Sequence, residues 1–330
     1  MGTTAVFPTA PARAGMYESF YLRAVSPVEP VGVWIRQTVH KRPGQRATGS
    51  VWCTVFDARR GAPFMHKSTS SELTAPAGGW IAIAGSELGP ERAHGSCGPA
   101  RWSLSYTSDE PELRHLAPRW LYRTPLPRTK LTSPAPAAMF DGVLELEGRD
   151  PIALREWPGM VGHNWGSEHA ERWIWLHGTA FEGGPGAWID VALGRVSIAG
   201  RMTPWVANGA LSLDGRRIRL GGLRARGLRV DESAQGCVLE LSGEGGLTVQ
   251  ARVEVPEGAA AGWRYADPDG GEHDVVNCSV SSLQLDVFTR QGSSRTLLAP
   301  HGAAYELGMR TLKGTGERDH GVPIAPFADG

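Results

Sequence analysis

Short runs rich in valine, isoleucine, threonine, tyrosine and tryptophan recur along the whole chain, and glycine, proline and aspartate separate them. Runs of this kind are typical of β-strands, and no long window shows the apolar period of an α-helix. One series of runs precedes the glycine-rich stretch 183–186, and a second series follows it. The pattern therefore predicts an all-β protein built from antiparallel barrels or sandwiches.

The length of 330 residues exceeds the usual size of a single domain, about 100–200 residues, and so favours two domains. We predict an N-terminal β domain over residues 1–180 and a C-terminal β domain over residues 181–312. A flexible tail is expected over residues 313–330, where apolar residues are few. The prolines between residues 110 and 136 predict an extended connection, which could form a strap over a barrel mouth.

Local signals in the second half predict two turns and two irregular strands. Asp214 and Gly215 stand between ALSL and RRIRL, and they tolerate the positive φ angles of a two-residue hairpin turn. The sequence DPDGG at 267–271 predicts a second turn. The runs 274–289 and 296–310 are long for single strands, so we expect them to be bent or bulged.

Charge and cysteine usage exclude several classes of partner. The 34 basic and 34 acidic residues balance, so no nucleic-acid partner is expected. No stretch has the roughly 18 apolar residues of a membrane span, and the N-terminus lacks an apolar signal segment, so we expect a cytoplasmic protein without stable membrane insertion. The cysteines lack the close spacing of metal or redox motifs and are expected to be free thiols. They are Cys53, Cys97, Cys237 and Cys278.

Histidine, tryptophan and acidic residues gather in the segment 159–177, which reads GMVGHNWGSEHAERWIWLH. Its first part is rich in glycine and predicts a bent strand end where the backbone comes close to another group. In its second part, aliphatic and aromatic residues alternate, as they do on the two faces of a strand. Ile174 and Leu176 share one face. The opposite face carries Trp173, Trp175 and His177. If that aromatic face points into a barrel, it lines a small-molecule pocket; the alternative is that these side chains only fill the core.

The segment supplies candidates for acid/base chemistry in His163, Glu168 and His169. Of these, Glu168 is the first choice as an acid, because a carboxyl group packed against Trp165 would be partly desolvated and would stay protonated. The spacing of these three residues matches no standard zinc motif, so we expect no metal or other cofactor.

A hydrophobic small molecule is the expected partner, held by aromatic and polar side chains near this segment. Arg23 and Arg36 lie in apolar strand patterns, where an inward-facing arginine could grip a ligand carboxylate. The alternative for both is an arginine on the outer face of a strand beside an acid. The predicted ligand-binding residues are Asn164, Trp165, Trp173, Trp175, His177 and Arg36.

The string GHNWG at 162–166, followed by RWIW at 172–175, resembles the signature of the carotenoid hydratase (hydroxyneurosporene synthase) and AttH-like superfamily. Tocopherol cyclases and several polyketide Diels–Alderases are related to that superfamily. Weaker supporting pieces are ESFYLR at 18–23, WIR at 34–36, LPR at 126–128 and NCS at 277–279. The resemblance implies two lipocalin-like β domains in tandem that hold an isoprenoid, polyene or polyketide-like ligand.

The resemblance also bears on the reaction. In the carotenoid hydratases that the chain resembles, an aspartate precedes HNWG and a tyrosine stands two residues earlier; here those positions are Gly162 and Met160. Alkene hydration needs a proton donor, so carotenoid hydratase activity is not expected. Two functions remain open: an enzyme that promotes cyclisation, isomerisation or addition in an apolar pocket, and a carrier that binds a lipid-like molecule unchanged.

Overall fold

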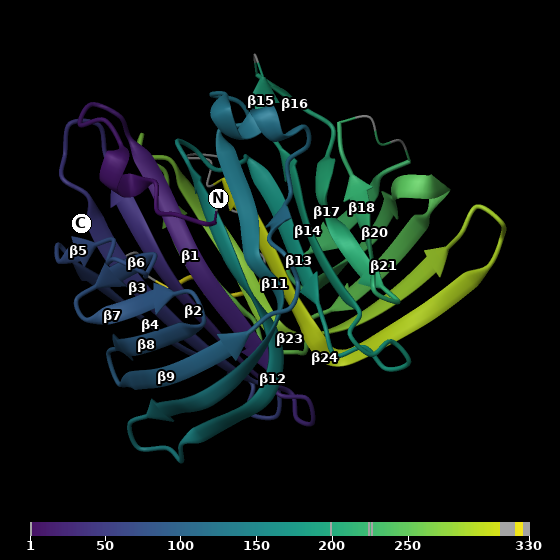
Figure 1. Ribbon diagram of the computed structural model, residues 1–330, viewed down its shortest axis with the longest axis horizontal. Coiled ribbons are helices and arrows are strands. Elements are labelled where there is room, and N and C mark those ends of the chain that lie inside the picture. The colour runs from purple at the N-terminus through teal and green to yellow at the C-terminus, as the bar shows by residue number, and fades with distance from the viewer. Residues whose placement is uncertain (1, 199, 224, 226, 311–320, 326–330) are drawn as a thin grey trace.

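The computed structural model describes residues 2–198, 200–223, 225, 227–310 and 321–325, and almost all of its regular structure is β-strand (Figure 1). Besides the strands, the described residues form three short 3₁₀ helices, η1 (Phe7–Thr9), η2 (Arg119–Arg123) and η3 (Glu244–Gly246). Within the described ranges no helix is long and apolar enough to cross a membrane. The prediction of an all-β protein is confirmed.

The first half of the chain forms one antiparallel sheet with the order β4-β3-β2-β1-β12-β11-β9-β8-β7-β6-β5, and β10 pairs with β11. Its strands are β1 (Met16–Val25), β2 (Val31–Lys41), β3 (Thr48–Asp57), β4 (Phe64–Ser70), β5 (Leu73–Thr74), β6 (Ile81–Ile83), β7 (Ser86–Gly89), β8 (Arg92–Cys97), β9 (Ala100–Thr107), β10 (Leu113–Arg114), β11 (Thr129–Leu146) and β12 (Ile152–Gly166). The sheet curls until β3 contacts β6 and β8, and the enclosed space forms the first barrel.

The second half forms another antiparallel sheet with the order β18-β17-β14-β13-β24-β23-β21-β20-β19, and β22 pairs with β23. Its strands are β13 (Arg172–Gly178), β14 (Trp188–Arg195), β17 (Val206–Leu213), β18 (Arg216–Gly221), β19 (Arg229–Ser233), β20 (Gly236–Ser242), β21 (Thr248–Glu254), β22 (Ala261–Ala266), β23 (Glu272–Phe288) and β24 (Ser294–Arg310). A bridge between Leu220 and Gly243 joins the two sides of this second barrel. A separate pair, β15 (Ser197–Ile198) and β16 (Arg201–Met202), stands outside both sheets.

The predicted turns and irregular strands are present. Asp214 and Gly215 have φ angles of 52° and 71° at the turn between β17 and β18. The turn at 267–271 joins β22 to β23. The long strands β23 and β24 pair with register shifts around Ser281, so the expected irregularity is real. All four cysteines are buried free thiols.

The chain crosses from the first sheet to the second between Gly166 and Arg172, earlier than the division at residue 180 in the sequence analysis. The strand β13, placed there in the N-terminal domain, pairs with β14 and β24 and belongs to the second sheet. Of the predicted tail, residues 313–320 and 326–330 lie outside the described residues. Residues 321–325 pack against β22, because Ile324 bridges to Gly262 and the Ala325 N–H donates to the Gly262 carbonyl.

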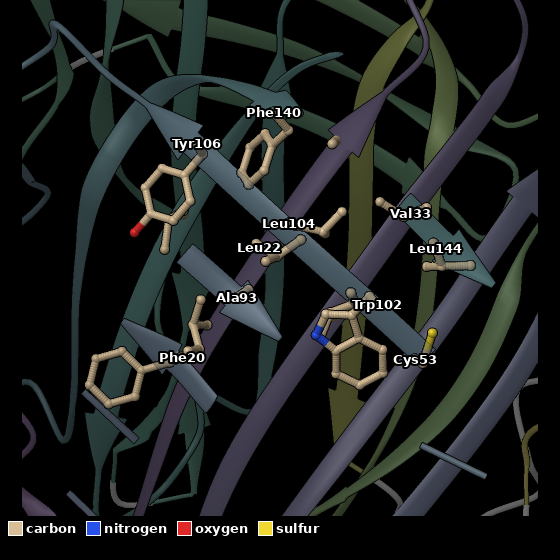
Figure 2. Packing of buried hydrophobic residues seen from close by; sticks show 14 of the residues in the cluster. Phe20, Leu22, Val33, Cys53, Ala93, Trp102, Leu104, Tyr106, Phe140 and Leu144 are labelled. Carbon is tan, nitrogen blue, oxygen red and sulfur yellow. The ribbon is translucent and has the colours of Figure 1, made fainter. Parts of the chain in front are cut away.

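Strand β1 shows how the two barrels share one packed layer. Its even-numbered residues Phe20, Leu22 and Ala24 belong to the core of the first barrel, part of which Figure 2 shows. Its odd-numbered residues Tyr21 and Arg23 face the other way, toward the second sheet. The residues of the layer come mainly from β1 to β3 on one side and from β13, β22, β23 and β24 on the other.

Two glycines in this layer accept an aromatic ring from the neighbouring strand. Gly162 pairs with Tyr21, and a Cβ atom at Gly162 would lie 2.1 Å from Cζ of that ring. Gly308 pairs with Trp173, and a Cβ atom there would lie 2.1 Å from the indole. Both glycines therefore allow a ring to lie flat across the strand, which a larger residue would prevent.

We expect the substitutions Gly162→Ala and Gly308→Ala each to destabilise the fold by about 1–3 kcal/mol, because the added methyl group displaces a packed ring. Gly194→Ala is the matched control, since a Cβ atom there meets only Ala170 at an ordinary 3.5 Å. Urea unfolding of the three variants measures the differences. Losses of equal size in all three would show that the ring contacts do not matter.

Candidate functional site

The aromatic face of β13 lies in the layer between the barrels and does not face a barrel interior. Ile174 and Leu176 fill the core of the second barrel. On the opposite face, Trp173 packs beside the cluster that contains Trp52, and Trp175 packs against Tyr21 with ring centroids 5.4 Å apart. The alternation was predicted correctly, but the aliphatic face is the one that fills the barrel.

A polar cluster in this layer centres on the carboxylate of Asp267, in the turn after β22. Its Oδ1 accepts hydrogen bonds from the backbone N–H of His169 at 2.9 Å and from His169 Nδ1 at 2.6 Å. Its Oδ2 accepts from His273 Nε2 at 2.8 Å. Asp267 thus ties the segment between β12 and β13 to the second barrel, in addition to the ion pairs that Glu168 and Glu171 of this segment form with Arg310.

These bonds fix the tautomer of His169. Burial tends to raise the pKa of Asp267, but the hydrogen bonds from His169 and His273 hold it well below its usual range. An ionised Asp267 requires a proton on Nδ1 of His169, which leaves the lone pair on Nε2. That Nε2 atom is buried and has no hydrogen-bond partner among the described residues. Burial lowers the pKa of His169 to about 4, so the ring is neutral near pH 7 and able to accept a proton.

A small cleft of about 30 Å³ adjoins His169. Its wall includes Tyr17, whose ring stacks on His169 with centroids 3.9 Å apart, and Arg36, whose guanidinium carbon lies 4.0 Å from the Tyr265 ring centroid. Trp173 stacks near the imidazole at 5.4 Å. The site is therefore an imidazole among aromatic rings beside one buried cation.

Glu306 of β24 completes the polar side of this layer. Its Oε1 accepts from Trp173 Nε1 at 2.9 Å, and its Oε2 accepts from the Tyr265 hydroxyl at 3.1 Å and from Asn277 Nδ2 at 3.2 Å. The carboxylate thereby orients Trp173 and Tyr265, two of the rings around His169.

The string GHNWG is divided between the two faces of β12. His163 lies within the first barrel, stacked between Phe20 at 4.0 Å and Trp165 at 4.5 Å, and its Nε2 bonds Glu18 Oε1 at 2.7 Å. Asn164 lies on the opposite face, because neighbouring residues of a strand alternate. The expectation that His163, Asn164, Trp165 and Glu168 line one cavity is therefore wrong.

Glu168 is also placed differently from the expectation. Its Oε1 lies 3.2 Å from Arg310, and its Oε2 pairs with Arg128. Two guanidinium groups stabilise the ionised carboxylate, so the neutral acid packed on Trp165 that the sequence suggested does not form.

His177 and Arg23 form a buried pair in the middle of the layer. Arg23 Nη1 donates to His177 Nδ1 at 2.9 Å, and His177 Nε2 donates to the Pro136 carbonyl at 3.0 Å. Arg23 also donates to the carbonyls of Ser279 and Gly302. These hydrogen bonds hold neighbouring strands together, and both ring nitrogens of His177 have partners.

The group His169, Asp267 and His273 has the donor types of a metal site, with all ligand atoms within 4.8 Å of one another. Metal-bound imidazoles normally donate their other ring N–H to an acceptor. Here the outer nitrogens, His169 Nε2 and His273 Nδ1, have no partner among the described residues, whereas the inner nitrogens already bond Asp267. The arrangement fits an aspartate that fixes two imidazoles better than it fits a cation site.

Comparison with known proteins places the fold in a class but leaves the activity open. No protein-family model matches the chain. The chain is 26% identical over 301 residues to Uncharacterized protein Rv0493c of Mycobacterium tuberculosis strain H37Rv, and the match covers 88% of this chain and 87% of that protein.

Solved structures show the same two-barrel fold. CghA with Sch210972 has a TM-score of 0.62 at 12% identity over 96% of both chains. A Nitrosomonas europaea protein named for AttH has a TM-score of 0.56 at 12% identity, over 93% of this chain and 97% of its own. Kievitone hydratase from Nectria haematococca has a TM-score of 0.52 at 10% identity, over 94% and 96%. The chain thus has the fold of AttH-type and related hydratase and CghA structures.

Several residues of the site were not singled out from the sequence. Asp267 was read only as a turn residue, and His273 and Glu306 lie in long strands without any motif. Tyr17 and Tyr265 are distant from each other in sequence but both contact His169. The sequence offers only a weak signal for such site residues, namely a polar residue in a strand whose two faces are otherwise apolar.

The histidines of the layer predict how stability depends on pH. Burial, helped by Arg23, lowers the pKa of His177 to about 4, whereas an unfolded histidine titrates near pH 6.5. Between these values the unfolded chain binds the additional proton, so stability falls as the pH is lowered, by up to about 1.4 kcal/mol per pH unit for each such histidine. His169 acts in the same direction.

We expect His177→Gln to weaken this dependence between pH 6.5 and 4.5, because glutamine can accept from Arg23 and donate to the Pro136 carbonyl without titrating. The exposed His94 supplies the matched control, His94→Gln. Urea unfolding across the pH range gives the slopes, and parallel curves for the parent and His177→Gln would contradict the assignment.

Proposed function

We propose that the protein binds a hydrophobic small molecule in the layer between its barrels and promotes its cyclisation, isomerisation or addition by acid/base chemistry. The observation that carries this proposal is the state of His169, whose Nδ1 is fixed by Asp267 while its Nε2 has no partner among the described residues. An imidazole held in this way takes a proton from the ligand and returns it to another atom.

The aspartate supports such a step electrostatically. As Nε2 accepts a proton the ring becomes a cation, and the Asp267 carboxylate at 2.6 Å stabilises that charge. The rings of Tyr17, Trp173 and Tyr265 give the ligand apolar contacts and exclude water. His163 and Glu168, the other predicted acid/base residues, are bound to Glu18 and to two arginines, so we assign them positioning roles.

The names of similar structures agree with this class of function. One neighbour is a hydratase by name, and another was solved with the small molecule Sch210972. Trp175 and Tyr21, which pack together at the centre of the layer, would form the apolar contacts next to the site. Cytoplasmic location and a role in secondary metabolism belong to this proposal as well.

The first test is conversion of a natural ligand. An organic extract of the source cells is incubated separately with the parent protein and with His169→Gln. The products are separated by chromatography, and their masses are determined by mass spectrometry. A cyclisation or isomerisation gives a product of unchanged mass, and we expect the variant to form it at least about 100-fold more slowly, because an acid/base group is lost. Arg264→Gln, which alters an ion pair with Asp274, serves as the control. Equal rates in parent and His169→Gln would remove His169 from the chemistry.

The second test concerns carotene hydration. We expect the protein not to add water to an acyclic carotene, because Gly162 stands where the carotenoid hydratases that the chain resembles have an aspartate. The ring of Tyr21 occupies the space beside that residue, so Gly162→Asp alone would displace the ring. The double variant Gly162→Asp with Tyr21→Ala makes room for the carboxylate. Hydration by the parent protein would contradict the assignment.

A carrier without chemistry is the alternative function, and one observation favours it. A second hollow of about 240 Å³ opens in the second barrel, and its lining among the described residues is mostly apolar, including Trp205, Leu228 and Leu241, with no acidic or basic side chain. Such a lining suits an apolar body. If a compound from the extract stays bound to the protein and neither the parent nor His169→Gln converts it, the carrier function is the correct one.

A further inference from the structure

We infer that Arg36 is the anchor for an anionic oxygen of the ligand, so that the substrate class is an apolar molecule with a carboxylate or enolate head group. This inference rests on the proposed function and specifies the ligand of the same site. Arg36 lies on β2, and neither of its partners within the protein, Ser19 and Tyr265, is a carboxylate.

Arg36 is a buried cation without an anionic partner. The residue is 5% exposed, its Nε donates to Ser19 Oγ at 2.6 Å, and its guanidinium lies over the face of Tyr265. In the part of the chain that the structure describes, no carboxylate forms an ion pair with it. A buried charge is normally paired or fully hydrogen-bonded, and a ring face only partly replaces water.

The comparison with Arg23 shows that burial alone does not explain this arrangement. Arg23 is fully buried too, but it donates to two backbone carbonyls and to His177, and burial lowers its pKa to about 9. Protein partners satisfy both of its Nη atoms, its Nε atom has no partner among the described residues, and it does not line the cleft beside His169. Arg36 has one hydroxyl and a ring, and it forms part of the wall of the cleft beside His169.

The cleft brings further unused polar atoms to the same place. His169 and His40 both line it, and the Nε2 atom of each is buried without a hydrogen-bond partner among the described residues. Glu18 also lines the cleft, but its carboxylate accepts from the N–H groups of Val6 and Phe7 and bonds His163. An anion entering the cleft therefore meets a cation that has no carboxylate partner, and the one carboxylate among the lining residues, Glu18, is already hydrogen-bonded.

The size of the cleft defines what enters it. A volume of about 30 Å³ accommodates roughly one water-sized group, which matches a head-group oxygen but not a ligand body. The apolar body would lie against the rings that border the cleft, Trp52 and Tyr265. An anionic oxygen on Arg36 would place the adjoining carbon atoms beside His169, and the Arg36 cation would stabilise the negative charge that develops on the ligand when His169 takes a proton from it.

The test compares two probes with the same apolar body, the fluorescent fatty acid cis-parinaric acid, which carries a carboxylate, and its uncharged methyl ester. With the parent protein, we expect the acid to bind at least tenfold more tightly than the ester. Arg36→Met should abolish this preference while leaving ester binding unchanged, and Arg36→Lys should retain part of it. Arg264→Gln, which alters a cation outside the cleft, should behave as the parent does.

The outcomes separate the two proposals. Equal affinity of the parent for acid and ester, or a preference that survives in folded Arg36→Met, would overturn the anion anchor and leave the apolar site intact. Binding of neither probe by the parent would overturn both the anchor and the proposed ligand class. Equal affinity of the parent for acid and ester overturns the anchor even if Arg36→Met does not fold, and in that case a full preference kept by Arg36→Lys overturns it as well.

Discussion

Strands β1 and β13 and the second halves of β12 and β24 bury both of their faces, one inside a barrel and the other in the layer between barrels, and this double burial governs the rest of the structure. An ordinary antiparallel strand has one wet face on which polar side chains lie freely. Here Arg23, Glu18 and His177 are almost completely removed from water. Every polar group in these strands must therefore find a partner within the protein or remain costly.

The double burial explains why the sequence revealed the strands but not the site. Alternation in RWIWLH predicts two distinct faces, and glycine and aspartate mark the turns, because these are local properties. Which face enters a barrel depends on the partner sheet, and both faces of β13 are apolar enough to be buried. The side chains of GHNWG are divided in the same way: a contiguous string cannot converge on one cavity when it lies in a single strand.

The polar residues of the layer could not be predicted because their partners are distant along the chain. Asp267 reaches His169 across 98 residues, and Glu306 reaches Trp173 across 133 residues. Neither spacing belongs to a motif, and both depend on how the second sheet packs on the first. Of the predicted site residues, Arg36, His169 and Trp173 gather around Tyr265, whereas Trp175 and His177 lie further along the same face of β13.

A second buried cluster shows what distinguishes a reactive imidazole from a structural one. Ser133, His115 and Asp190 are fully buried and have the residue types of a hydrolase triad. Their bonds do not have its order, because the serine hydroxyl donates directly to Asp190 at 2.5 Å while His115 Nδ1 bonds the Asn208 carbonyl at 3.1 Å. The same Nε2 of His115 serves both the serine and the aspartate, so no nitrogen is left for a substrate. His169 differs because only one of its nitrogens is bound by the protein. The proposed site therefore rests on an unpartnered ring nitrogen beside a cleft and a cation, and not on the residue types themselves.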